Sequence, residues 1–322
     1  MIRLLRRGGR TLETAGVAPG WSLPDDIVWV DLLSPTREEE QAVEAALGLK
    51  LPTREDMAEI EASSRLYQEG EASYLTTEVI TGAGPDGQRP TLEPVTFVLV
   101  RDRLITIRYA SPRAFAIFEA QLADRDGMCD GGEEVFLGLL DAIVDRIADI
   151  LEAASNQVET LSGAIFDRPR RTARFEVVLG KLGRWQSINA KARNSLIGLT
   201  RLMAFAALSP HIASGKEHAG RLKSLQRDVR SLTDHAGHMS GDITFLLDAT
   251  LGLINIEQSG IIKIFSIAAV AFLPPTLVAS YFGMNFKHMA EFELPWGEPL
   301  ALGLMLVSVI LPLLYFKRKG WL

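Results

Sequence analysis

The sequence predicts an α+β protein in which an N-terminal α/β domain is followed by a long helical hairpin, a stalk helix and two C-terminal transmembrane helices. Two runs without a charged residue, 264–282 and 299–316, carry the membrane part of this prediction. As a helix, the first run would rise by roughly 28 Å, close to the hydrocarbon thickness of a bilayer. The stalk is indicated by the stretch 216–273, which lacks proline and is long enough for a helix of roughly 85 Å.

Residues 21–123 alternate between strand and helix patterns. Ser34 or Thr36 would cap an acidic helix that follows the first strand. Four apolar runs predict strands, the last two as a β-hairpin: 27–33, 74–80, 95–100 and 104–109. The sequence contains neither a phosphate-binding GxxxxGK[ST] motif nor an evident nucleophile–base pair, so neither an ATP-driven pump nor an enzyme is predicted.

Two long helices of opposite charge are predicted next, over 133–165 and 172–208. Like charges three or four residues apart on a helix repel. We therefore expect an antiparallel pair with its acidic and basic faces in register; the alternative is that the acidic row attracts cations. The charged residues are Asp141, Asp145, Asp149 and Glu152 on the first helix and Arg174, Lys181, Arg184, Lys191, Arg193 and Arg201 on the second.

Basic residues orient the membrane hairpin. Lys317, Arg318 and Lys319 directly follow the second uncharged run, which places the C-terminus in the cytoplasm by the positive-inside rule. A hairpin returns to the side that it left, so we expect the region before residue 264 to be cytoplasmic too. The loop 287–298 is then external and carries more acidic than basic residues. The net charge of −6 argues against a nucleic-acid partner, and the single cysteine fits a reducing compartment.

These changes of pattern divide the chain into consecutive segments. The soluble part comprises an α/β domain, a helical hairpin and a stalk helix, and the membrane part comprises two helices joined by a periplasmic loop. The expected bounds are 1–130, 131–210 and 211–263 for the three cytoplasmic segments, 264–286 for the first membrane helix, 287–298 for the loop, 299–316 for the second membrane helix and 317–322 for a basic cytoplasmic tail.

The first membrane run carries a polar stripe. Alternating steps of three and four residues from Ser259 select one seam of a helix with a 3.5-residue repeat. Four of the seven seam residues carry a hydroxyl group; the seam is Ser259, Ile262, Ser266, Ala269, Leu273, Thr276 and Ser280. In a membrane, a small and polar stripe faces either another helix or water.

The residues after the stripe resemble a known signature. Residues 281–286 read YFGMNF, and Gly-Met-Asn at the end of the first of two C-terminal membrane helices is the hallmark of the CorA family of divalent-cation (magnesium/cobalt) transporters, part of the two-transmembrane GxN superfamily. Three further stretches resemble CorA sequences: NIEQ at 255–258, FLPPTL at 272–277 and YFKRK at 315–319. The chain is therefore similar to members of this family, most closely in its C-terminal part.

The resemblance implies a homopentameric funnel in a bacterial inner membrane, with both termini cytoplasmic. It implies Mg²⁺ uptake, with Co²⁺ and Ni²⁺ as further substrates, driven by the membrane potential and gated by intracellular Mg²⁺. The partners would be copies of the chain, the lipid bilayer and divalent cations; no cofactor is expected, and Mg²⁺ is both substrate and regulatory ligand. The implied residues are an ion-binding mouth at Gly283, Met284 and Asn285, a pore lining of Ser259, Ile262, Ser266, Leu273, Thr276 and Ser280, and regulatory metal ligands at Glu55, Asp56 and Asp228.

Some residues depart from this pattern or have another explanation. Ser259 stands where magnesium-transporting relatives usually have Asn, and Ala290 replaces the usual proline after Gly-Met-Asn. Glu55 and Asp56 are equally explained as favourable charges in the first turn of a helix. Two alternatives to Mg²⁺ transport stay open: a zinc transporter of the same superfamily, with His288 as an outer ligand, and a membrane-tethered cytoplasmic sensor, which would have no reason to keep a hydroxyl stripe.

Overall fold

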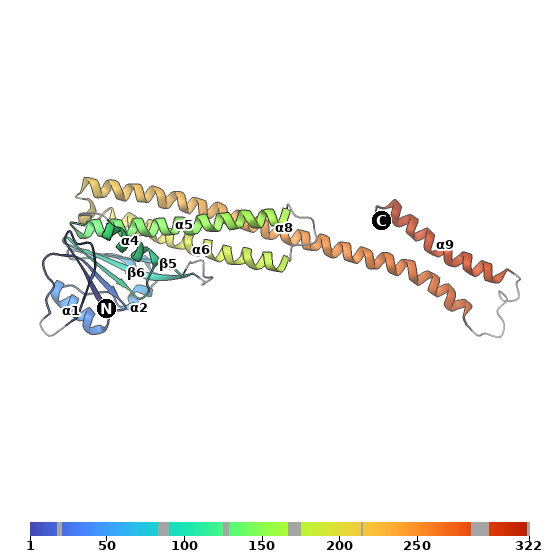
Figure 1. Cartoon of the computed structure of the whole chain (residues 1–322), viewed down its shortest axis with the longest axis horizontal. Coiled ribbons are helices and arrows are strands. Elements are labelled where there is room, and N and C mark those ends of the chain that lie inside the picture. Colours follow the sequence, from blue (N-terminus) through green and yellow to red (C-terminus); the bar gives the residue numbers. More distant parts are fainter. Residues whose placement is uncertain are drawn as a thin grey trace. The chain divides into compact units, whose positions relative to one another are not determined.

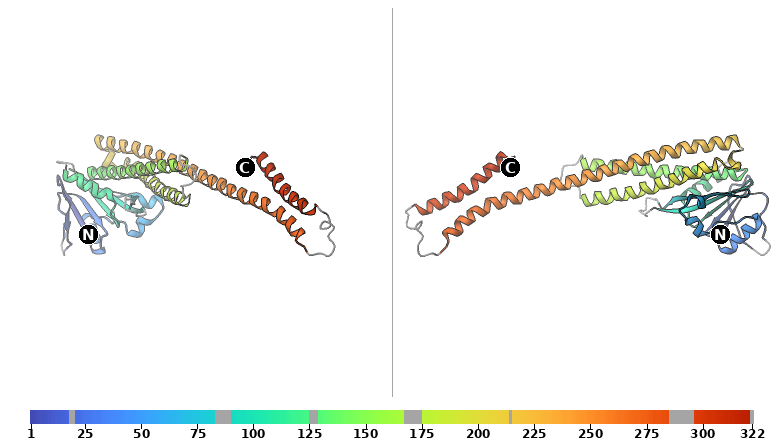
Figure 2. Two further views of the ribbon diagram at one scale, coloured as in Figure 1. Left: turned by 45° about the vertical axis from the view of Figure 1, so that its right-hand side comes forward. Right: turned by 180° about the vertical axis from the view of Figure 1, so that it is seen from behind.

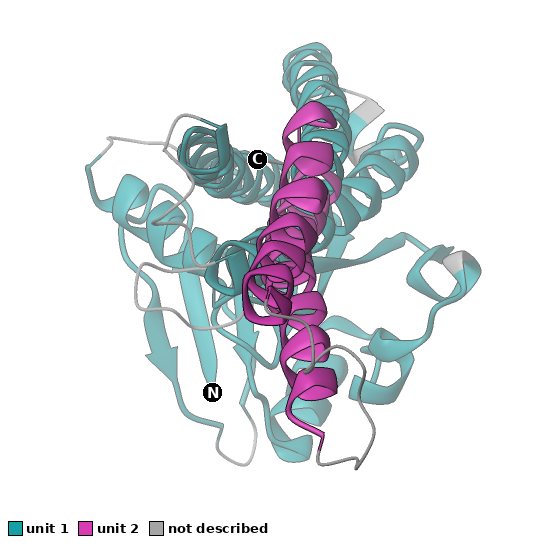
Figure 3. Cartoon of the chain, turned by 90° about the vertical axis from the view of Figure 1, so that its right-hand side faces the viewer, with its two compact units in different colours: residues 1–247 teal, residues 248–322 magenta. Residues whose placement is uncertain are grey.

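The computed structural model describes residues 1–17, 21–82, 90–124, 129–166, 175–213, 215–284 and 296–320 (Figure 1). The chain divides into two compact units, 1–247 and 248–322, which Figure 3 colours separately. The first unit combines a β-sheet with helices, and the described part of the second is helical. The predicted α+β chain with apolar helices at its C-terminal end is confirmed.

The sheet of the first unit has seven strands in the order β2-β1-β3-β7-β6-β5-β4. Its neighbouring strands are antiparallel except for the pair β3 and β7. The strands are β1 (Ile2–Arg6), β2 (Glu13–Ala15), β3 (Ile27–Leu33), β4 (Leu66–Glu69), β5 (Ala72–Thr81), β6 (Thr91–Val100) and β7 (Arg103–Arg108). The four predicted strands are confirmed as β3, β5 and the hairpin β6–β7. The short strands β1, β2 and β4 lie toward the two edges of the sheet and were not predicted from the sequence.

The sheet buries apolar side chains on both faces, because successive side chains of a strand point to opposite sides. On one face Val30 and Leu32 pack in a core with Val43 and Met57 from the helices α1 and α2. On the other face, the Trp29 ring lies 5.8 Å from the ring of Phe118. Helices α1 and α2 therefore cover one side and α4, α5 and α6 the other (Figures 1 and 2). The helices of this unit are α1 (Arg37–Leu47), α2 (Arg54–Ala58), α3 (Ala62–Arg65), α4 (Arg113–Asp124), α5 (Gly132–Phe166), α6 (Phe175–Ala206), α7 (Pro210–Ala213) and the first part of α8 (Lys216–Phe282).

The acidic helix after β3 begins at one of the two predicted caps. Thr36 is the N-cap of α1, and its Oγ1 accepts a hydrogen bond from the Glu39 N–H at 3.3 Å. The Glu39 carboxylate accepts in return from the Thr36 N–H at 2.9 Å. This reciprocal capping box satisfies two backbone donors that would otherwise lack a partner at the helix start.

The two long helices α5 and α6 form the predicted antiparallel pair (Figure 1), but the predicted pairing of their charges is wrong. Within the described ranges, no ion pair joins the acidic row of α5 to a basic residue of α6; the ion pair of that row, Asp149 with Arg146 at 3.8 Å, lies within α5. Arg174 lies outside the described residues. The side of α6 that packs against the rest of the unit is apolar instead, since Leu182, Leu196 and Leu199 are buried, while the acidic row of α5 is exposed.

The second unit consists, in its described part, of the C-terminal portion of α8 and of α9 (Gly297–Arg318). Both helices are long and apolar enough to cross a membrane. Their large apolar side chains are exposed, with Phe272 at 73% and Leu306 at 63%. Soluble proteins rarely expose a continuous apolar surface of this extent, so these helices correspond to the two membrane runs identified in the sequence.

A buried ion network joins three strands and a helix in the first unit. Asp31 of β3 is fully buried and accepts hydrogen bonds from Arg108 Nη2 at 2.9 Å, Arg3 Nε at 3.0 Å and Thr106 Oγ1 at 2.7 Å. Arg3 also pairs with Glu119 of α4 at 2.7 Å. Burial opposes ionisation of Asp31, but the two guanidinium groups outweigh it and hold the pKa of this carboxyl below its usual value.

Replacing Asp31 with Asn should destabilise the first unit by about 3–5 kcal/mol, because it leaves the buried Arg108 guanidinium without a counter-charge. This loss of stability should be complete above pH ~4, where the aspartate of the unfolded chain is ionised. It should shrink as the pH falls through the pKa of Asp31 in the folded chain, which is lower. The measurement is the thermal midpoint of the full chain in detergent as a function of pH. Asp25→Asn is the control, because Asp25 forms an exposed ion pair with Arg103; equal effects of the two changes would contradict a structural role for the network.

Candidate functional site

The polar seam predicted to line a pore lies along α8. This helix is uninterrupted from Lys216 to Phe282, and residues seven apart on it are offset by only about 20° around its axis. Ile262 is 64% and Leu273 67% exposed in the single chain. The seam therefore forms a continuous surface strip made of two adjacent rows: Ser259, Ser266, Leu273 and Ser280 in one, and Ile262, Ala269 and Thr276 in the other.

Two prolines add backbone oxygens to this part of α8. Pro274 and Pro275 lie inside the helix and have no N–H, so the carbonyl oxygens of Val270 and Ala271 lose the helical donors that they would otherwise have. Such carbonyls are tolerated in a membrane helix where a neighbouring helix, a hydroxyl group or water satisfies them. The hydroxyl of Thr276 already donates within the helix, to the Phe272 carbonyl at 2.6 Å. The Pro-Pro dipeptide was a sequence signal for these polar atoms that the sequence analysis did not use.

The described part of α8 ends at the predicted ion-binding mouth. The Gly283 N–H donates to the Ala279 carbonyl at 2.9 Å, and the Met284 N–H donates to the Tyr281 carbonyl at 3.2 Å. A Cβ atom at position 283 would come within 3.1 Å of the Ala279 oxygen, so the tight last turn favours glycine. Asn285, the residue of this motif with a side-chain amide, lies outside the described residues, as do His288 and Ala290.

The predicted regulatory residues lie on two elements of the first unit. Glu55 and Asp56 are in the first turn of α2, and Asp228 is exposed on α8. The Asp56 carboxylate accepts a hydrogen bond from the Thr53 N–H at 2.9 Å, which is the local capping role considered as an alternative explanation. None of the described contacts joins Asp228 to Glu55 or Asp56, so their predicted meeting across a subunit boundary stays a prediction.

Asp145 of the acidic row of α5 lies near enough to α8 for its carboxylate to be repelled by that of Asp228, a neighbour that the sequence did not indicate. Burial raises the pKa of Asp145, and the carboxylates of Asp141, Asp149 and Asp228 raise it further. Ionised Asp145 thus lies in a negative field made by two helices. Such a field attracts cations, although no three described His, Cys, Asp or Glu side chains are placed to hold one metal ion.

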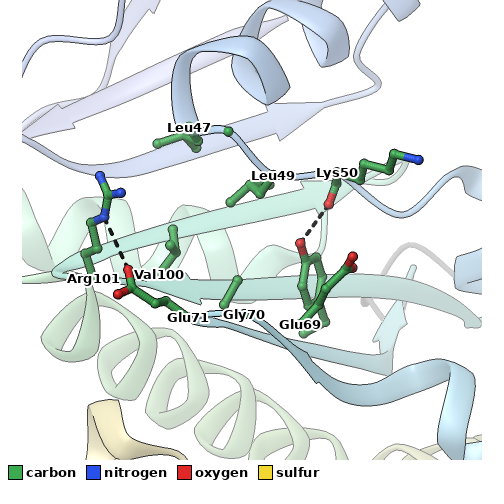
Figure 4. Close-up of a pocket in the computed structure, with 11 residues that line it drawn as sticks. Leu47, Leu49, Lys50, Glu69, Gly70, Glu71, Val100 and Arg101 are labelled. Atoms are coloured by element: carbon green, nitrogen blue, oxygen red, sulfur yellow. Dashed lines mark hydrogen bonds and ion pairs between the residues drawn. The ribbon is translucent and has the colours of Figure 1, made fainter.

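A pocket of about 430 Å³ lies at the edge of the sheet that carries β4 (Figure 4). Its charges are mixed, since Arg101 pairs with Glu71 at 3.6 Å and Lys50 and Glu69 are also among the lining residues. Burial raises the pKa of Tyr74 to about 12, so its hydroxyl stays protonated and donates to the Lys50 carbonyl at 2.8 Å. Among the described residues, no three His, Cys, Asp or Glu side chains of this pocket are placed to hold one metal ion.

Comparison with known proteins identifies the family to which this chain belongs. The family model described as "CorA-like Mg2+ transporter protein" matches residues 24–318. The chain belongs to the CorA family. Two relatives called "Magnesium transport protein CorA" are 34% identical to it: that of Pasteurella multocida over 295 residues and that of Salmonella typhimurium over 298, each match covering 92% of both chains.

Solved structures support the same fold. The CorA magnesium transporter from Methanocaldococcus jannaschii is 19% identical, with a TM-score of 0.76 over 100% of this chain and 99% of that one. The full-length CmaX protein is 17% identical, with a TM-score of 0.75 over 99% and 97%. The fold of this CorA family member is thus shared over both of its units, including the apolar helices.

Replacing Asp145 with Asn should stabilise the first unit by a few tenths of a kcal/mol at neutral pH, because it removes a repelled charge. A raised pKa makes the ionised form costly, so this gain should be present above the folded-state pKa and vanish as the pH falls through it. The thermal midpoint of the full chain in detergent, measured from pH 4 to 8, reports the difference. Asp234→Asn, at an exposed position of α8, should show no such gain; a gain of equal size would mean that the α5–α8 field is not responsible.

Proposed function

We propose that this chain is the subunit of a membrane channel that takes up Mg²⁺. The observation that carries the proposal is the polar seam of α8, which runs from Ser259 to Ser280, just before Gly283 and Met284, in a chain whose relatives are called magnesium transport proteins. A helix that served only as an anchor would gain nothing from a row of hydroxyl groups in hydrocarbon, where unpaired polar groups cost free energy. The seam is therefore the water-facing wall of an ion path.

The channel must be an oligomer, because two membrane helices cannot enclose a pore. The resemblance to CorA sequences implies five copies, whose α8 seams would line the axis. Mg²⁺ sheds its water reluctantly, so a selective mouth presents neutral oxygens to the hydrated ion. Asn285, which follows Gly283 and Met284 in the sequence, supplies amide carbonyls for this task when it is repeated around the axis. Leu273 forms the hydrophobic constriction.

The protein lies in a bacterial inner membrane, with both termini in the cytoplasm. Lys317 and Arg318 lie in the last turn of α9, which supports this orientation by the positive-inside rule. The periplasmic loop then offers an acidic approach to the mouth. Entry requires no ATP, because two positive charges that cross a potential of 100 mV gain about 4.6 kcal/mol.

Replacing Asn285 with Ala should abolish Mg²⁺ influx into proteoliposomes that hold the reconstituted protein, while assembly remains intact. The reason is the loss of the amide oxygens that receive the hydrated ion. Influx of Mg²⁺, Co²⁺, Ni²⁺ and Zn²⁺ is measured separately, so that a zinc transporter is recognised by its own ion. Leu302→Ala, on α9 and outside the seam, is the matched control; normal Mg²⁺ influx in a correctly assembled Asn285→Ala protein would remove this residue from the mouth.

Regulation follows from the placement of the acidic residues. If Glu55 and Asp56 of one subunit approach Asp228 of the next, the contact is loose when empty and tight when a divalent cation bridges it. Two like charges about 4 Å apart cost on the order of 4 kcal/mol at an effective dielectric constant of 20. Several such contacts per oligomer bias a two-state pore, so that intracellular Mg²⁺ closes its own path of uptake.

The double variant Asp56→Asn, Asp228→Asn should conduct normally and close only at a higher internal Mg²⁺ concentration. Asn at position 56 keeps an acceptor for the Thr53 N–H, so α2 retains its cap. Patch recordings with stepped internal Mg²⁺ measure the closing concentration, and Asp234→Asn serves as the control. If the double variant closes at the parental concentration, these carboxylates are not the sensor.

A further inference from the structure

The basic residues of α6 lack the partner that the sequence led us to expect. No ion pair reaches Lys181, Arg184, Arg193 or Arg201 from any of the described residues, and the ion pair of the acidic row of α5 lies within α5. Between Val177 and Ala206 the helix contains no acidic residue. These four basic side chains of α6 therefore form no ion pair within the described part of the chain.

Part of this basic face lines a pocket. The pocket measures about 540 Å³, within the range of small-molecule sites. Its walls include Pro90, Gly180, Gly183, Arg184, Ser187 and Lys191. The five residues of α6 follow one another at steps of three, one, three and four, so they share one face of the helix. No acidic side chain is among the described lining residues.

The basic side chains that line the pocket, Lys191 and Arg184, keep N–H donors that bond to no described residue. The Lys191 ammonium group donates to the Pro90 carbonyl, which fixes its position and leaves two of its three N–H donors unused. The Arg184 guanidinium group forms no hydrogen bond or ion pair with another described residue and has five N–H donors. Together with the Ser187 hydroxyl, these groups present many donors and no carboxylate acceptor, which is the chemistry that recognises phosphate oxygens.

Two glycines in the wall have no packing role. A Cβ atom at Gly198, farther along α6, would lie 2.5 Å from Thr77 Oγ1, so the contact between α6 and the sheet requires glycine there. At Gly180 and Gly183, by contrast, a Cβ atom would meet nothing within 4 Å. Glycine inside a helix is unfavourable relative to alanine. Its use at both positions leaves the backbone open to close approach by a ligand.

We propose that this pocket binds the di- or triphosphate group of a nucleotide. A single phosphate ion would fill only a small part of its volume, whereas a chain of phosphates reaches from Arg184 to Lys191, which lie seven residues or about 10 Å apart along the helix. Ile188 and Pro90 also line the pocket, although both are largely buried, so the charged donors of α6 provide its main ligand-binding groups. The site is separate from the seam of α8, so binding does not depend on the proposed ion transport.

The test is calorimetric titration of the full chain in detergent with ATP, pyrophosphate and orthophosphate, without added Mg²⁺. ATP and pyrophosphate should bind saturably and orthophosphate much more weakly. Arg184→Gln and Lys191→Gln should each weaken binding by about tenfold or more, as expected when a charged donor to phosphate is lost. Gln at position 191 keeps a donor for the Pro90 carbonyl. Arg193→Gln, on α6 but outside the pocket, should bind as the parent does.

Gly183→Ala gives a readout that a merely structural role would not produce. It should raise the thermal midpoint, because alanine favours the helix, and yet weaken binding, because its methyl group enters the pocket. Absence of saturable binding of both ATP and pyrophosphate, or parental binding by both the Arg184 and Lys191 variants, overturns the proposal. So does binding confined to phosphatidylglycerol vesicles, or a change of oligomeric state without polyphosphate binding; these results would make the face a lipid contact or a contact between copies of the chain.

Discussion

The free-energy cost of an unsatisfied peptide group in hydrocarbon governs the C-terminal part of this chain. It requires that the apolar run after Lys263 be helical, because only a helix satisfies its own backbone there. Pro274 and Pro275 then break this rule locally and leave two carbonyl groups without helical donors. The same membrane helix also carries a row of hydroxyl groups. The free-energy cost of these polar atoms is tolerable only where water or another helix satisfies them. This is the physical basis for assigning α8 to an ion path.

Two carboxylates of the first unit, Asp31 and Asp145, differ in how their charges are balanced by neighbouring groups. Asp31 is fully buried and surrounded by the donors of Arg3, Arg108 and Thr106, so its charge is compensated and holds strands and helix together. Asp145 is exposed to the field of other carboxylates and is not compensated within the chain. A compensated charge contributes stability that is independent of cations. The charge of Asp145 is instead repelled by its neighbours, which include Asp228 of α8, the helix that carries the seam.

Two sets of charged side chains in the helical hairpin do not pair with each other. The acidic row of α5 and the basic face of α6 are adjacent in sequence and opposite in sign, yet they point in different directions. The acidic row makes a negative field without a described metal-binding cluster, and the pocket beside Arg184 and Lys191 offers donors for polyphosphates. One helical hairpin thus separates the two kinds of ion whose concentrations are linked in a cell, because nucleotide phosphates bind Mg²⁺.

The sequence by itself determined which segments form strands and helices where one periodicity dominates over many residues. The runs that became β3 and β5 and the two membrane helices belong to this group, since hydrophobic pattern is a local property; for the cap of α1 the sequence offered Ser34 or Thr36, and the structure has Thr36. Motif resemblance also determined the family, and a 3.5-residue repeat of small and polar residues determined the position of the seam. Only the tertiary structure decided the rest. A helix with apolar residues on several faces can turn its charged row to either neighbour, so sequence could not tell that α5 directs Asp145 to α8. Likewise, β1 and β4 are short and form only because a neighbouring strand completes their hydrogen bonds, and the pocket on α6 exists because Pro90, far away in sequence, lies against Lys191.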